Sequence, residues 1–181
     1  MRRSWLIGGG VALVLFFVAR AASASQRSVI PMLDVGLSKS QREAAAVIER
    51  VVLEKMPEAT PELIMAIIAN AWRESALNPR AKGDASSGTP HSFGLFQLNT
   101  ARGVGIGLDE VAMMDPAYNT GIIMDREVLT SRGKKLQAAN ALPSPDAGDM
   151  ASIFVYDIER PGDKPGEAQK ARNAVASLFG V

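Results

Sequence analysis

From residue 38 onward, helix start and stop signals surround apolar residues at helical spacing. Ser38 with Gln41, or Ser40 with Glu43, has the spacing of a capping box, and the helix that follows ends at Pro57. No stretch shows the alternation of polar and apolar residues that is typical of a strand. The sequence therefore predicts an all-α fold.

Further helix signals continue to the end of the chain. Thr60-Pro61 opens a second helix, whose apolar stripe reaches Glu74 and which must stop near Pro79. We expect three more helices, from Asp115 to Gly133, from Ser144 to just before Pro161, and from about Pro165 to Phe179. These signals predict one compact helical domain over residues 38–181, and residues 25–37 lack a clear period and are expected to be a linker.

Residues 1–24 form a membrane-directed segment. An uncharged stretch from Trp5 to Ala19 follows two arginines and ends at Arg20. It is either a signal peptide with an A-x-A-like cleavage site at 22–24, or an uncleaved signal anchor long enough to span a bilayer as a helix. In both cases the body of the protein is expected to be membrane-anchored or exported.

Composition excludes several classes of protein. The chain has no cysteine and one histidine, His91, which rules out a disulfide scaffold, a cysteine nucleophile and a His-rich metal cluster. The net charge of +1 includes three arginines in residues 1–24, and the rest has 17 basic against 19 acidic residues. Such a body is a poor candidate for binding nucleic acid. We expect no metal and no cofactor.

Glu74 is the strongest candidate for a catalytic group. Ile67, Ala71 and Glu74 are spaced i, i+4 and i+7, so Glu74 lies on or beside the buried stripe of its helix. An apolar wall and a helix C-terminus both favour the neutral form of a carboxyl, which suits a general acid acting on an acetal oxygen. The alternative is a structural glutamate paired with Arg73 or Arg80.

A second polar segment follows the loop over residues 79–92. Within residues 92–99, SFGLFQLN, Gly94 allows the backbone to approach a ligand closely. Gln97 and Asn99 offer both donors and acceptors for amide or sugar hydroxyl groups. Phe93 and Phe96 offer a stacking face, although we expect one of the two to lie in the core. We expect this segment to fold back toward Glu74.

These motifs resemble a known family. RESALNPRAKGD at residues 73–84, followed by SFGLFQLN, resembles the lysozyme-like superfamily of lytic transglycosylases and goose-type lysozymes. With the element F-x-x-x-x-E-R-P at residues 154–161, the chain is most similar to phage tail lysozyme-type domains, over roughly residues 38–180. The resemblance implies a glycosidase that cleaves the β-1,4 bond between N-acetylmuramic acid and N-acetylglucosamine in peptidoglycan.

The resemblance also assigns roles to residues. It makes Glu74 the catalytic acid/base. The residues that would shape the sugar site are Ser75, Gly94, Leu95, Phe96 and Gln97, with Tyr156 facing the cleft. The tripeptide AYN that contains Tyr118 imitates a third transglycosylase motif, but it lies at a helix start, and we expect Tyr118 to be structural.

Two mechanisms stay open. A hydrolase needs water and usually a second carboxylate. The candidates are Asp84, Asp157 and Glu159, each of which could instead be a capping or salt-bridge residue, and Glu159-Arg160 in particular resembles a structural ion pair. A transglycosylase instead uses the muramyl 6-hydroxyl, so that one carboxyl serves as acid and then as base.

The expected function is local opening of the cell wall by a phage particle or an envelope machine. The alternative is a noncatalytic peptidoglycan-binding or virion structural module on the same scaffold. The expected partners are glycan strands, the membrane through the N-terminal segment, and other virion or envelope proteins. The sequence leaves open phage or host origin, the fate of residues 1–24 and the oligomeric state.

Overall fold

The computed structural model describes residues 28–33, 36–83, 91–159 and 162–181. The expected membrane-directed segment at 1–24 lies outside this range. Within the described part of the chain, none of the helices combines the length and apolar character needed to cross a bilayer.

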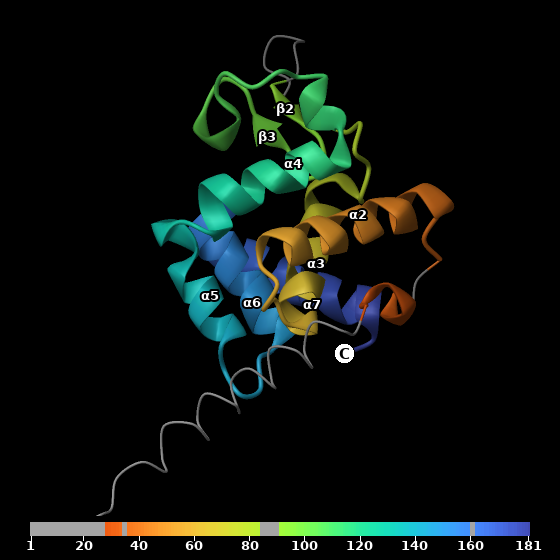
Figure 1. The fold of residues 1–181 in the computed structure, drawn as a ribbon, viewed down its shortest axis with the longest axis vertical. Helices are drawn as coiled ribbons and strands as arrows, with labels where there is room; N and C mark the ends of the chain where they lie inside the picture. The colour runs from red at the N-terminus through yellow and green to blue at the C-terminus, as the bar shows by residue number, and fades with distance from the viewer. Residues whose placement is uncertain (1–27, 34–35, 84–90, 160–161) are drawn as a thin grey trace, which may run out of the picture.

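Helices make up most of the described residues, as the sequence predicts (Figure 1). They are α2 (Lys39–Lys55), α3 (Pro61–Ser75), α4 (Pro116–Ile123), α5 (Lys134–Asn140), α6 (Ala147–Phe154) and α7 (Lys164–Phe179). The π-helical turns η4 (Met124–Val128) and η6 (Val155–Glu159) continue α4 and α6, and short 3-10 turns lie at η1 (Ile30–Met32), η2 (Gly103–Gly105), η3 (Ala112–Met114) and η5 (Ser131–Gly133).

A small antiparallel sheet departs from the all-α expectation. Its strands are β1 (Lys82–Gly83), β2 (Ser92–Phe93) and β3 (Leu98–Asn99), with β2 in the middle. Strands of two residues are too short to produce a recognisable alternation, so the sequence pattern could not reveal them.

Helix α3 lies at the centre of the core. Every residue from Leu63 to Ala71 is buried, and α2, α6 and α7 pack against this helix (Figure 1). A helix that is apolar on all sides is stable only when other elements surround it. The burial of α3 therefore fixes the position of its C-terminal end, where Glu74 lies.

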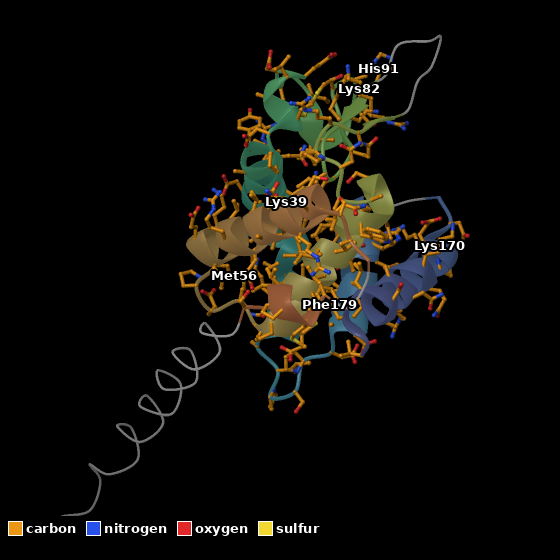
Figure 2. All side chains as sticks on the ribbon, turned by 90° about the vertical axis from the view of Figure 1, so that its right-hand side faces the viewer. Lys39, Met56, Lys82, His91, Lys170 and Phe179 are labelled. Carbon is orange, nitrogen blue, oxygen red and sulfur yellow. The ribbon has the colours of Figure 1, made fainter. Side chains whose placement is uncertain are left out.

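The molecule has a helical part and a smaller part that contains the sheet. In Figure 2, Lys82 and His91 lie together at the sheet end, while Met56 and Phe179 lie in the helical part. Helix α4 lies beside the sheet and packs on α2 (Figure 1). It therefore connects the two parts.

Most helix ends agree with the sequence signals. Ser38 and Gln41 form a complete capping box, Thr60 and Asp115 cap α3 and α4, and Gly180 ends α7 with a φ of 67°. The single helix expected over 115–133 is wrong, because α4 gives way to η4 and η5 before a separate helix, α5, begins. Gly133 makes this turn possible, since a Cβ there would lie 1.9 Å from the carbonyl oxygen of Val128.

The interpretation of residues 25–37 as a linker is wrong for their described part. Val29 and Leu33 are buried in the core. The Glu49 carboxylate of α2 accepts hydrogen bonds from the backbone N–H of Val29 at 2.6 Å and from the hydroxyl of Ser28 at 2.8 Å. This segment is therefore part of the domain, and its apolar residues are too few to show a period.

We expect Glu49→Ala to lower the free energy of unfolding by about 2 kcal/mol, because it leaves the buried N–H of Val29 without an acceptor. The control is Glu54→Ala, which removes only an exposed i, i+4 pair with Arg50 and should cost less than about 0.5 kcal/mol. Chemical denaturation measures both. Equal losses in the two variants would contradict this role of Glu49.

Candidate active site

Glu74 lies in the last turn of α3 and is half-buried. Directly after the helix, Ala76 and Leu77 have left-handed backbone conformations, with φ of 52° and 57°. Such angles are uncommon outside glycine, and they cluster at functional sites. The side chain of Gln41 donates a hydrogen bond of 3.0 Å to the carbonyl oxygen of Ala76, so α2 holds this turn in place.

The segment 92–99 forms a tight turn between β2 and β3. Gly94 has a φ of 79°, and a Cβ on it would lie 2.2 Å from the carbonyl oxygen of Met113. Gln97 also has a left-handed φ, of 46°, and its side-chain amide donates a 3.0 Å hydrogen bond to the carbonyl oxygen of Gly94. Gly83 lies against this side chain, because a Cβ there would meet Oε1 of Gln97 at 2.3 Å. The turn thus presents Gln97 in one fixed orientation.

Asn119 holds this turn from α4. It is fully buried, and its Nδ2 donates to the carbonyl oxygens of Phe93 at 3.2 Å and Met113 at 3.0 Å. Its Oδ1 accepts from the backbone N–H of Phe96 at 3.0 Å. The sequence interpretation considered AYN for its tyrosine and missed the asparagine. Tyr118 itself is 39% exposed and contributes its backbone N–H to the Asp115 cap.

A cleft of about 660 Å³ lies beside this turn. One wall comes from the sheet part and the other from α6 and the residues that follow it. The described residues that line it are Phe96, Gln97, Leu98, Asn99, Arg102, Gly103, Val104, Ile123, Phe154, Ile158, Glu159 and Gly162. Amide and charged groups therefore face one space that has apolar side chains behind them, as is common in ligand sites.

The structure brings some of the expected sugar-site residues to this cleft. Phe96 and Gln97 line it, and the buried Gly94 and Leu95 shape the turn behind them. Ser75 is not among the described lining residues, and its hydroxyl donates to the carbonyl oxygen of Ala71 at 2.9 Å. The hydrogen bond that the Ser75 hydroxyl donates is therefore to its own helix, α3.

Tyr156 lies at a different hollow from the 660 Å³ cleft. It is 39% exposed and lines a separate hollow of about 330 Å³ with residues of α5, α6 and α7. The resemblance predicts that this tyrosine faces the cleft, but Tyr156 is not among the described residues that line the 660 Å³ cleft.

The candidates for a second acid lie in different surroundings. Glu159 lines the cleft, whereas Asp157 forms an ion pair of 3.1 Å with the exposed Lys135. Asp84 and Arg160 lie outside the described residues. The expected pairing of Glu159 with Arg160 is therefore outside the described part of the chain, and Glu159 forms an ion pair of 3.1 Å with Arg73.

Arg73 binds two acidic side chains near the cleft. Its guanidinium donates to Oε2 of Glu159, to Glu167 of α7 and, at 3.1 Å, to the side-chain oxygen of the buried Asn70. The side chain of Glu159 is only 16% exposed, and its buried Oε1 has no hydrogen-bond partner among the described residues.

The surroundings of Glu159 favour its neutral form. Burial raises the pKa of Glu159 to about 7, the nearby negative charge of Glu74 adds to the rise, and Arg73 opposes it. By contrast, a hydrogen bond from Lys170 is the largest cause that lowers the pKa of the partly buried Glu167. Glu74 is not among the described lining residues of the cleft, but it is close enough to Glu159 for their charges to interact.

This arrangement suits acid–base chemistry. Glu159, whose pKa is raised to about 7, lines a cleft that also holds amide groups, and Glu74 is close enough for the two charges to interact. In the described part of the chain, no group of three or more His, Asp or Glu side chains is placed to hold a metal ion.

Residues 43–179 match the family model of the phage tail lysozymes. The chain therefore belongs to the phage tail lysozyme family, which confirms the resemblance drawn from its motifs. Neither a curated protein nor a solved structure matches it. Membership indicates lysozyme-like action on peptidoglycan as the general activity.

Proposed function

We propose that this protein is a glycosidase that cleaves the β-1,4 bond between N-acetylmuramic acid and N-acetylglucosamine, with Glu74 as the general acid/base. The observation that supports this most is the contact of Arg73, the neighbour of Glu74 in the last turn of α3, with Glu159, a carboxyl that lines the cleft. Glu74 therefore lies near a space of suitable size for sugars.

The residues that line the cleft have separate roles in substrate binding in this proposal. Phe96 and Phe154, whose ring centroids are 6.1 Å apart, are both buried and pack together as the apolar base of the cleft. Gln97 and Asn99 bind the acetamido and hydroxyl groups by hydrogen bonds. The exposed Arg102 at the rim attracts the carboxylates of peptide stems or lactyl groups.

The chemical step begins with proton transfer from Glu74 to the bridging oxygen, and the glycosidic bond breaks as the leaving sugar takes that proton. Water then attacks the anomeric carbon, and Glu74 takes a proton from it. If the muramyl 6-hydroxyl attacks instead, the same carboxyl serves as base and the product is a 1,6-anhydro sugar. The setting we propose is a local opening of the cell wall by a phage particle or an envelope machine.

The test is clearing of a suspension of purified cell walls, combined with pelleting of the protein with intact walls. We expect the purified protein to clear the suspension. Folded protein that pelleted with the walls but never cleared them would contradict an enzyme. That outcome would support the alternative, a noncatalytic wall-binding or virion structural module.

A further inference from the structure

The hollow of about 330 Å³ at Tyr156 shares none of its described lining residues with the 660 Å³ cleft. Most of its lining comes from α6 and η6, which form one continuous helix, and these residues follow one another at helical spacing: Asp149, Ser152, Ile153, Tyr156 and Asp157. This spacing places them on one face of the helix. Phe154 and Ile158, which line the cleft, belong to a different face. The hollow is therefore a separate feature of the surface.

Helices α5 and α7 complete the hollow. Figure 1 shows α6 between these two helices, and α6 packs on both of them. Lys135 lines the hollow from α5, and Arg172 lines it from α7. Lys164, the first residue of α7, donates a hydrogen bond of 3.4 Å to the backbone carbonyl of Tyr156 and so connects η6 to α7. The lining residues are thus held on packed helices, which position side chains more precisely than loops do.

The middle of the hollow is apolar and aromatic. The ring of Tyr156 is exposed, and the partly buried Ile153 lies beside it in the lining. The hydroxyl of Ser152 donates to the carbonyl oxygen of Gly148 at 3.0 Å, so the helix itself uses this group. An exposed tyrosine offers a large, rigid contact surface to a ligand at low conformational cost. Polar recognition must then come from the charged residues at the edges.

Two ion pairs frame this apolar middle. Lys135 binds Asp157 at 3.1 Å, and Arg172 binds Asp149 at 2.5 Å. The two acidic residues are eight positions apart on one helix, which corresponds to about 12 Å. Exposed ion pairs contribute little to stability, so each partner can exchange the other for a ligand group of the same charge. The two positive and two negative charges balance, so the hollow does not favour a polyanion.

We propose that this hollow binds a short zwitterionic peptide, the stem peptide of peptidoglycan. Such a peptide carries carboxylates and, on its diamino acid, an ammonium group, and four extended residues span about 13 Å. Its carboxylates bind Lys135 or Arg172, its ammonium binds an aspartate, and its alanine methyl groups lie on Tyr156. The choice of peptidoglycan rests on the proposed function. The hollow keeps the protein on the wall while the cleft holds a glycan strand.

The test is a nuclear magnetic resonance titration of the ¹⁵N-labelled full-length protein with the synthetic tetrapeptide L-Ala-γ-D-Glu-L-Lys-D-Ala. We expect saturable shifts of the backbone amides of Ile153, Tyr156 and Arg172. Tyr156→Ala and Arg172→Gln should each weaken binding by at least about 5-fold. The same tetrapeptide with acetylated amines and amidated carboxylates should bind about 10-fold more weakly, since only apolar contacts remain.

Each variant has a matched control. Tyr118→Ala removes a tyrosine that, like Tyr156, is 39% exposed, and Arg50→Gln removes an arginine from an exposed ion pair with Glu54. Neither residue lines the hollow, so both controls should bind the tetrapeptide as the wild type does. Circular dichroism checks the fold of every variant. Tyr156→Phe, which keeps the ring, replaces Tyr156→Ala if the latter does not fold, and it should retain binding.

The proposal would be overturned if the amides of the hollow showed no saturable shift, if the controls lost as much affinity as the variants, or if the uncharged peptide bound equally well. Shifts of these amides with N,N′-diacetylchitobiose, but not with the tetrapeptide, would make the hollow a sugar site instead. The tetrapeptide has no glycosidic bond, so the test is independent of cleavage. Peptide binding by a protein that does not cleave peptidoglycan would contradict only the proposed function, and cleavage without peptide binding would contradict only this inference.

Discussion

Glu74→Gln is expected to reduce wall clearing by at least about 100-fold, because an amide cannot donate a proton to the glycosidic oxygen or take one back. The change is nearly isosteric and lies in the last turn of α3, which is fixed by the burial of Leu63 to Ala71. We therefore expect the free energy of unfolding to change by less than about 1 kcal/mol. Pelleting with intact walls should persist, since the cleft residues are unchanged.

The matched control is Glu62→Gln, a change of the same chemistry in the first turn of the same helix. Loss of a favourable charge at the helix N-terminus should cost no more than about 1 kcal/mol of stability, and clearing should be retained. If Glu74→Gln cleared walls at the wild-type rate, Glu74 would not be the acid/base and another carboxyl would have to serve.

Asn119→Ala is expected to have the largest effect on stability, a loss of about 3 kcal/mol in the free energy of unfolding. The substitution removes three hydrogen bonds from a fully buried side chain, and it leaves the N–H of Phe96 and the carbonyls of Phe93 and Met113 without this partner. Because these groups hold the turn that presents Gln97, clearing should fall as well. Thermal and chemical denaturation measure the loss.

Tyr118→Ala is the control for this prediction. The tyrosine is the preceding residue on the same helix, but its side chain is exposed, and a loss of less than about 0.5 kcal/mol is expected. A larger loss in Tyr118→Ala than in Asn119→Ala would show that the tyrosine, and not the asparagine, is the structural residue of this segment.

Local signals in the sequence predict much of the helical framework. Ser38, Thr60, Asp115 and Gly180 act through backbone groups only a few residues away, so each can be recognised without knowledge of the fold. The position of Glu74 at the end of a buried helix follows from helical periodicity for the same reason.

Long-range contacts could not be predicted in this way. Asn119 acts on a turn more than 20 residues earlier, and Glu159 bonds a residue 86 positions away. A polar residue type inside an otherwise apolar helix is a signal for such contacts, but it does not identify the partner. The break between η4 and α5 was missed because the residues of the π-helical turn η4 have no distinctive composition.

Mass spectrometry of the soluble products from purified peptidoglycan is the most direct test of glycosidase activity. We expect disaccharide-peptide fragments that end in muramic acid, in amounts that rise with time and are nearly absent with Glu74→Gln. Reducing ends would indicate water as the nucleophile, and ends lighter by one water would indicate the muramyl 6-hydroxyl. Intact glycan strands after incubation with folded wild-type protein, or products cut only in the peptides, would contradict a glycosidase.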